Sequence, residues 1–117
     1  MFLIYSDGVL IGQSALEHGD PPMGVALGEF IPAAAFAAAR LEAVVSEQQE
    51  DIRILRGLSL RTSDQKLIRC THVAVIECGE SSNPIGWEVE CMGFESPSYA
   101  DLFPNHVKAY DAGIQDR

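Results

Sequence analysis

The sequence predicts an α+β fold: a mostly antiparallel, curled sheet of about six or seven strands with one long helix packed across it. Three observations predict it. Short apolar runs separated by turn residues fill residues 2–31 and 54–94, an alanine-rich helical segment lies between them, and a shorter helical pattern ends the chain. The resulting order, β-β-β-α-β-β-β-β-α, is typical of the α+β class. A small β-barrel with helices is the alternative. With 117 residues, the chain 1–117 is expected to form a single domain.

A hairpin and a third strand are predicted first. Residues 2–5 and 9–17 are rich in Leu, Ile and Val, and they flank Ser6-Asp7-Gly8, a turn in which Gly8 can adopt a positive φ. Residues 24–31, "GVALGEFI", predict a third strand that is interrupted by glycine.

A long helix is predicted from about Pro32 to Asp51. Proline suits the first helical turn because its missing N–H costs nothing there, and the alanines that follow are strong helix formers. One stripe is expected to face the core, and it consists of Ala34, Ala37, Ala38, Leu41, Val44, Val45, Gln48 and Ile52. The opposite side carries a row of small residues, Ala35, Ala39, Ala43 and Ser46, beside Phe36. This row either admits a partner subunit or only raises helix propensity.

The second half predicts four strands and a short C-terminal helix. Residues 58–69, "LSLRTSDQKLIR", predict a hairpin, and the apolar residues 71–77 predict a central strand covered on both faces. Residues 85–94 alternate, with Val89 facing one way and Glu88 and Glu90 the other. A short helical turn then precedes a helix that is expected to begin at Pro104 and end near Gly113.

The formal net charge of −9 argues against two classes of partner. Nucleic-acid affinity depends on Lys and Arg neutralising phosphates, and an anionic membrane surface repels the chain for the same reason. No apolar run approaches the length of a membrane span or of a signal peptide. We therefore expect a cytoplasmic location, in which the three cysteines, Cys70, Cys78 and Cys91, are reduced thiols.

The charges are unevenly placed along the chain. Six of the eight basic residues lie between positions 40 and 69. Residues 70–107 contain no Lys or Arg, but they contain six acidic residues, among them Glu77, Glu88 and Glu90. This distribution predicts a negative face that attracts a basic protein partner. If the two segments lie side by side in the fold, the asymmetry cancels.

Residues 17–24, "EHGDPPMG", hold the candidate catalytic residues. Glu17, His18 and Asp20 can converge because Gly19 permits a sharp turn, and a carboxylate that fixes the tautomer of a histidine is what a general base needs. The same residue types also ligate metals. The competing interpretation is a rigid crossing between two strands, since consecutive prolines order the chain at low entropic cost.

No metal or cofactor is predicted. Four potential ligands, Cys70, His72, Cys78 and Cys91, lie within 22 positions, but their spacing lacks the close pairs that are typical of structural zinc. The glycines match neither of the phosphate-binding loop patterns, and no serine or cysteine lies in a nucleophile motif.

The leading hypothesis is therefore a non-enzymatic module that binds a basic protein or a second copy of itself. The candidate binding residues are Glu77, Glu88, Glu90, Phe36 and Ala39. The alternative is a small enzyme or ligand-binding domain whose site is the Glu17–Met23 loop, with His18 as the base and Asp20 or Glu17 orienting it.

Overall fold

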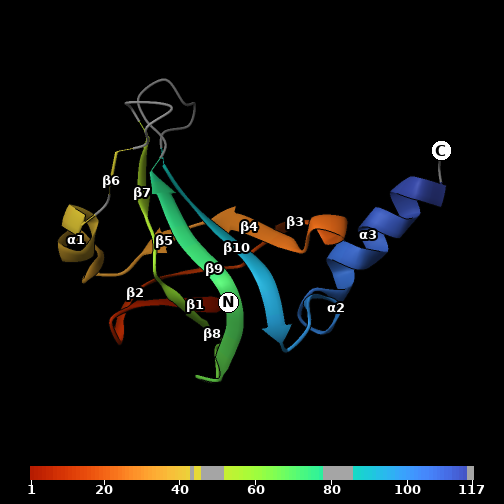
Figure 1. Ribbon diagram of the computed structural model, residues 1–117, viewed down its shortest axis with the longest axis horizontal. Helices are drawn as coiled ribbons and strands as arrows, with labels where there is room; N and C mark the ends of the chain where they lie inside the picture. Colours follow the sequence, from red (N-terminus) through yellow and green to blue (C-terminus); the bar gives the residue numbers. More distant parts are fainter. Residues whose placement is uncertain (43, 46–51, 78–85, 116–117) are drawn as a thin grey trace.

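The computed structural model describes residues 1–42, 44–45, 52–77 and 86–115, and it shows a curled antiparallel half-barrel with a few short helices (Figure 1). The main path of the sheet follows the order β3-β4-β10-β9-β8-β1-β2-β5, and β7 also pairs with β9 and with β6. The α+β class predicted from the sequence therefore agrees broadly with the structure, which is dominated by its sheet.

The elements have the following bounds. The strands are β1 (Phe2–Ser6), β2 (Val9–Ser14), β3 (His18–Asp20), β4 (Val25–Glu29), β5 (Ile31–Pro32), β6 (Val44–Val45), β7 (Arg53–Leu55), β8 (Ser59–Arg61), β9 (Leu67–Glu77) and β10 (Trp87–Ser96). The helices are α1 (Phe36–Ala39), α2 (Tyr99–Leu102) and α3 (Pro104–Gln115), with 3₁₀ turns η1 (Pro21–Met23) and η2 (Arg40–Glu42).

The curl of the sheet originates in β9. This strand pairs with β10 along most of its length, but its other edge pairs with β8 at Leu67 and Ile68 and with β7 only from Val75 onward. The burial also changes between these ends, because Ile68 is the one buried residue at the first end, whereas Val73, Ala74 and Val75 are buried consecutively at the second. Beside this change lies Gly93, whose φ of 71° and whose contact with the Thr71 side chain exclude a Cβ atom. Glycine at this position therefore permits the bend.

The core lies on the concave side of the sheet, and Phe103, between α2 and α3, covers one end of it, whereas α3 itself projects away from the sheet (Figure 1). Phe103 is buried and packs its ring 5.4 Å from that of Phe2 and 5.3 Å from that of Phe94. At the other end Phe36 of α1 is buried against Phe30 and Trp87. The remaining fully or nearly fully buried side chains include Ile4, Ile11, Leu16, Leu60, Ile68, Val73, Val75, Val89 and Cys91.

The prediction of a long helix from Pro32 to Asp51 is wrong for the described part of that range. Ile31 and Pro32 form β5, which pairs with β2, the α-helix spans only Phe36–Ala39, and Val44–Val45 form β6. Residues 43 and 46–51 lie outside the described residues. Alanine favours a helix only weakly without an apolar face to bury, and in α1 Phe36 is the buried residue.

The predicted number of strands is too low. Ten strands are described instead of six or seven, because β3, β5, β6 and β7 are too short, at two or three residues each, to give a periodic pattern. The two hairpins and the helix that begins at Pro104 are confirmed. The second strand of the 58–69 hairpin and the central strand 71–77, predicted as two strands, form the single strand β9. Among the helices in the described ranges, none is long and apolar enough to cross a membrane.

Candidate functional site

The loop that holds the candidate catalytic residues forms a stiff edge of the sheet. His18–Asp20 make β3, an exposed strand that pairs with β4, and Pro21–Met23 form η1. Gly24 ends η1 with a φ of 64°, and its N–H donates to the carbonyl oxygen of Pro21 at 3.0 Å. In the ranges that the structure describes, neither His18 nor Asp20 makes a side-chain hydrogen bond, so these two residues do not form an acid–base pair.

Glu17 accepts a hydrogen bond from the backbone of the neighbouring strand β4. Its Oε1 atom accepts the N–H of Glu29 at 2.9 Å, which fixes the end of β4. Desolvation raises the pKa of Glu17, but the hydrogen bonds from the N–H groups of Glu29 and of Glu17 itself, together with the charge of His18, outweigh it and hold the pKa below its ordinary value. The carboxylate is thus engaged in holding the fold.

Behind Glu17 the chain makes a tight corner, which we call the Gly28 corner and define as Ser14, Leu16, Glu17 and Gly28. Leu16 is fully buried in a left-handed conformation with φ 47°, and its N–H donates to the buried Ser14 Oγ at 3.1 Å. A Cβ atom on Gly28 would lie 2.5 Å from Glu17 Oε2, 2.6 Å from Ser14 Oγ and 2.8 Å from Leu16 Cα. Only glycine fits beside this corner.

A tyrosine and a second histidine lie against β3. Tyr99 Oη donates to the carbonyl oxygen of Val25 at 2.9 Å and lies 3.1 Å from Nδ1 of His106. Because the phenol has one proton and uses it for Val25, Nδ1 of His106 carries a proton and donates to Tyr99. A Cβ on Gly19 would collide with both side chains. Desolvation, with the charge of Asp20, raises the pKa of Tyr99.

His106 also stacks on Phe103, with ring centroids 5.0 Å apart and planes 8° apart. It shares a cavity of about 280 Å³ with Glu17 and Phe2, but the carboxylate there is already bonded to Glu29. The Tyr99–His106 pair was not predicted as a unit from the sequence. No local spacing indicates it, because Tyr99 lies in α2 and His106 in α3, and Phe103 between them is not helical.

The acidic residues predicted as a binding face, Glu77, Glu88 and Glu90, differ in their contacts. Glu77 is bound by the guanidinium of Arg40, with Arg40 Nη2 2.6 Å from Oε1 and Arg40 Nε 2.8 Å from Oε2. This hydrogen-bonded ion pair lowers the pKa of Glu77. Glu88 and Glu90 are half-buried on β10, opposite Glu29 and Leu27 of β4. Arg40 thus lies beside part of the acidic segment and cancels some of its charge.

The other two predicted binding residues lie in different surroundings. Phe36 is 5% exposed and packs edge-on against Phe30 and Trp87, at centroid distances of 4.9 and 5.3 Å, so it belongs to the core. Ala39 lines an open cavity of about 250 Å³ between the β1–β2 hairpin and α1, which we call the hairpin–helix groove. Its lining residues are Ser6, Asp7, Val9, Ile11, Ala35, Ala38, Ala39 and Glu42.

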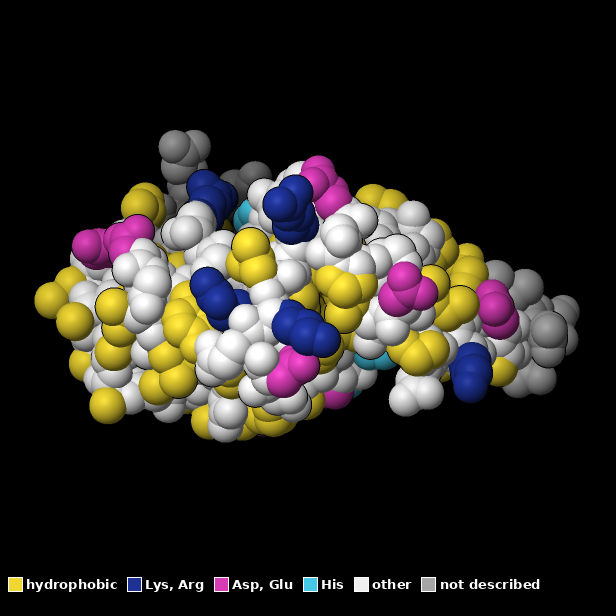
Figure 2. Space-filling model, turned by 90° about the horizontal axis from the view of Figure 1, so that it is seen from below, with side chains coloured by type: hydrophobic (Ala, Val, Ile, Leu, Met, Phe, Trp, Pro, Cys, Tyr) yellow, Lys and Arg dark blue, Asp and Glu magenta, His cyan; other side chains and the backbone are white. Residues whose placement is uncertain are grey.

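One large hydrophobic side chain of this groove, that of Val9, is 52% exposed. Leu10 and Leu41, which are 39% and 87% exposed, are chain neighbours of the lining residues Val9, Ile11 and Glu42. Figure 2 shows hydrophobic side chains gathered at the end of the molecule that carries α1 and the turn of the hairpin, with acidic side chains next to them. The alanines keep the floor of the groove shallow, and Asp7 and Glu42 supply the negative charges.

Within the described residues, no group of three or more His, Cys, Asp or Glu side chains is placed to hold a metal ion. Cys70 and Cys91 are free thiols, and Cys78 lies outside the described residues. Desolvation raises the pKa of Cys70 to about 11, with a contribution from Glu95, and raises that of Cys91 further. Both thiols are therefore protonated at neutral pH, and neither is an activated nucleophile.

Comparisons with protein-family models, with curated proteins and with solved structures found no match for this chain.

Proposed function

We propose that this chain is a small cytoplasmic protein-binding module whose contact surface is the hairpin–helix groove. Its partner is a basic segment of another protein, which places apolar side chains in the groove and Lys or Arg side chains against Asp7 and Glu42. The observation that carries the proposal is the exposure of Val9 in an alanine-lined groove that also has Asp7 and Glu42 in its lining.

The apolar part supplies the affinity. Burying a large aliphatic side chain contributes about 1.5–3 kcal/mol, and Val9 is exposed in the groove beside the alanines of α1. Contiguous exposed apolar surface rimmed by polar groups is typical of interaction sites, whereas isolated exposed hydrophobics carry no meaning. The small side chains of Ala35, Ala38 and Ala39 let a partner approach the backbone of α1 closely.

Charge favours a basic partner over a second copy. The rim residues Asp7 and Glu42 are both acidic, and the whole chain has a net charge of −9. In a symmetric dimer built on the groove, each acidic rim would face its own copy, because the same patch is used by both subunits. Like charges facing each other across an interface disfavour association, and a basic segment removes that repulsion.

The catalytic alternative has less support. It needs His18 beside a carboxylate in a concave site, whereas His18 lies on an exposed edge strand and Glu17 is bonded to the backbone of Glu29.

The test uses a defined probe. A fluorescein-labelled amphipathic peptide of about 14 residues, built only of Leu and Lys, is titrated with the protein and followed by anisotropy. The protein should bind it, more weakly at higher salt, and an analogue with Glu in place of Lys should not bind. Val9→Ser should weaken binding by about tenfold, since the exposed valine of the groove is buried in the complex. Asp7→Asn with Glu42→Gln should reduce the salt dependence.

Leu67→Ser is the matched control, because Leu67 is also exposed, at 51%, but lies outside the groove. This variant should bind the peptide as the unmodified chain does. Equal binding of the Leu–Glu peptide, or equal binding by the Val9→Ser variant, contradicts the proposal. Sedimentation of the protein alone tests whether a second copy occupies the groove: a dimer that Val9→Ser dissociates would assign the groove to self-association instead.

A further inference from the structure

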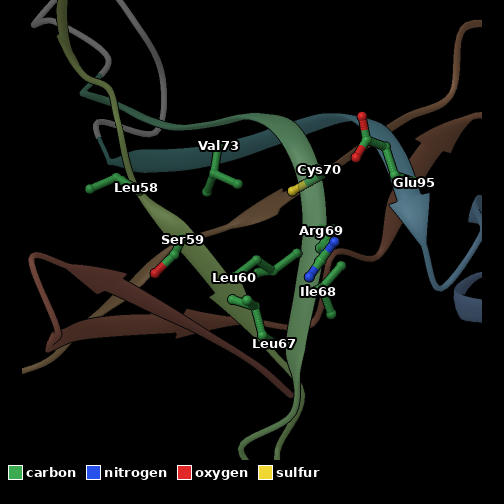
Figure 3. Close-up of a pocket in the computed structure, with 9 residues that line it drawn as sticks. All are labelled: Leu58, Ser59, Leu60, Leu67, Ile68, Arg69, Cys70, Val73 and Glu95. Carbon is green, nitrogen blue, oxygen red and sulfur yellow. The ribbon is translucent and has the colours of Figure 1, made fainter.

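A second hollow opens on the concave side of the sheet, away from the hairpin–helix groove (Figure 3). It has a volume of about 320 Å³, and it is lined by Leu58, Ser59, Leu60, Leu67, Ile68, Arg69, Cys70, Val73 and Glu95. We call it the β9 cavity, because most of its lining comes from β9 and from the strand β8 beside it.

The β9 cavity exists because β7 and β8 diverge from β9. β8 pairs with β9 at Leu67 and Ile68, and β7 pairs with it from Val75 to Glu77. Among the described strands, none pairs with residues 69–72 on this edge. Gly57, with a φ of 73°, lies between β7 and β8, and the N–H of Leu58 reaches the carbonyl oxygen of Val73 at 3.4 Å. The hollow is thus framed by regular strands at both ends.

The floor of the β9 cavity is apolar. Leu60, Ile68 and Val73 are at most 3% exposed, and Leu58 is 9% exposed. Cys70 points into the hollow from β9, as Figure 3 shows, and its thiol is half-buried and uncharged at neutral pH. The floor therefore suits an aliphatic group rather than a polar one.

The mouth of the β9 cavity carries one charge of each sign. β9 and β10 change register between Phe94 and Ser96: Phe94 pairs with Cys70 and Ser96 with Arg69, so Glu95 is the extra residue of a β-bulge. Bulges redirect side chains, and here the carboxylate of Glu95 reaches the cavity from β10 while Arg69 comes from β9. Within the described residues, neither side chain takes part in an ion pair.

We infer that the β9 cavity binds a small zwitterion with an apolar side chain, of the chemical class of a free aliphatic α-amino acid. The ligand's ammonium group faces Glu95, its carboxylate faces Arg69, and its side chain lies on Leu58, Leu60 and Val73. A cavity of 320 Å³ is at the small end of the range for ligand sites, which fits a ligand of this size. A ligand with a single charge would leave one of the two mouth residues without a counterion.

The test is a titration of the ¹⁵N-labelled protein with L-leucine, up to about 20 mM, followed by amide chemical shifts. Shifts are expected at the amides of Leu58, Cys70 and Val73. Leucinamide lacks the carboxylate and 4-methylpentanoate lacks the ammonium group, and each should bind at least about tenfold more weakly than leucine. Absence of shifts at these amides, or equal binding of all three compounds, overturns the inference.

Two variants test whether Arg69 binds the ligand's carboxylate and Glu95 its ammonium group. Arg69→Gln and Glu95→Gln should each weaken leucine binding by about fivefold or more, whereas Glu95→Gln should not weaken the binding of 4-methylpentanoate, which has no ammonium group. Glu90→Gln, on β10 but outside the cavity, is the matched control and should bind leucine unchanged. Leucine binding that is unaffected in both Arg69→Gln and Glu95→Gln contradicts the inference. Val9→Ser, in the groove, should leave leucine binding intact, so the two proposed sites are tested independently.

Discussion

The two ends of the half-barrel are built in opposite ways. At the Gly28 corner and the adjoining Tyr99–His106 pair, nearly every polar group has a partner, and glycines at positions 19 and 28 remove side chains that would collide. At the hairpin–helix groove, the lining is mostly alanine and aliphatic, and the side chain of Val9 is left exposed to solvent.

This difference shows that chemically versatile residues do not by themselves mark a functional site. Glu17 and His106 are of the types that catalyse reactions, but each is engaged in a hydrogen bond that holds the fold together. The groove has no such residue types in its floor, yet it leaves apolar surface exposed, which a stable fold does not require. Three substitutions test how strongly the Gly28 corner and the Tyr99–His106 pair stabilise the fold.

Gly28→Ala should have the largest effect. The added Cβ meets the backbone at Leu16 Cα as well as two side-chain oxygens, so the strand and the corner must separate. Overpacking of this kind costs about 1–3 kcal/mol, and urea denaturation should show it as a lower midpoint. Gly86→Ala is the control, because a Cβ there meets nothing within 4 Å, and its effect should stay within about 0.5 kcal/mol. Equal midpoints for the two variants would show that the Gly28 corner accommodates the added Cβ atom without loss of stability.

Tyr99→Phe should have an intermediate effect. The substitution keeps the ring against Phe103 but removes the hydroxyl, so the carbonyl oxygen of Val25 and Nδ1 of His106 both lose their partner. The expected loss in the free energy of unfolding is about 1 kcal/mol, since the group is only partly buried.

Tyr110→Phe is the matched control, because Tyr110 is 41% exposed and its hydroxyl makes no hydrogen bond in the described ranges. Thermal denaturation of both variants should place Tyr99→Phe clearly below the control. If the two variants melt together, the Tyr99–His106 pair does not stabilise this end of the sheet.

The parts of the fold that the sequence predicts are those with long, regular patterns. Both hairpins and the start of the last helix were predicted, because each combines hydrophobic periodicity with a turn or a proline. The long helix was wrong, since alanine propensity competed with pairing of Ile31 and Pro32 to β2 and of Val44 and Val45 to β7. Pairing partners distant in sequence leave no local signal.

The same reason limits what the sequence says about sites. Glu17, His18 and Asp20 attract attention because they are neighbours in the chain, but the contacts that matter join Glu17 to Glu29 and Tyr99 to Val25. Glu95 was not predicted as a site residue, because its place at the mouth of the β9 cavity depends on a β-bulge that is visible only in the register of β9 and β10. Ala39 was predicted from a small-residue row on a long helix, and it lines the groove from a helix of four residues.

Glu17→Gln should have the smallest effect, and its signature is in the pH dependence. The folded state holds the pKa of Glu17 below its ordinary value of 4.5, so the unfolded chain binds more protons in acid. The stabilisation by the charged carboxylate is therefore complete above about pH 4.5 and is lost as the pH falls through the lower, folded pKa. The stability difference between the unmodified chain and Glu17→Gln should shrink over that acidic range, measured by urea denaturation at successive pH values.

Glu42→Gln is the control. It removes an equal charge from the rim of the groove without removing a described hydrogen bond, so it separates the loss of charge from the loss of the contact with Glu29. If the stability difference for Glu17→Gln stays constant from neutral to acidic pH, the charged carboxylate does not stabilise β4. The comparison would then lose Glu17 as an example of a polar group that holds this end of the half-barrel together.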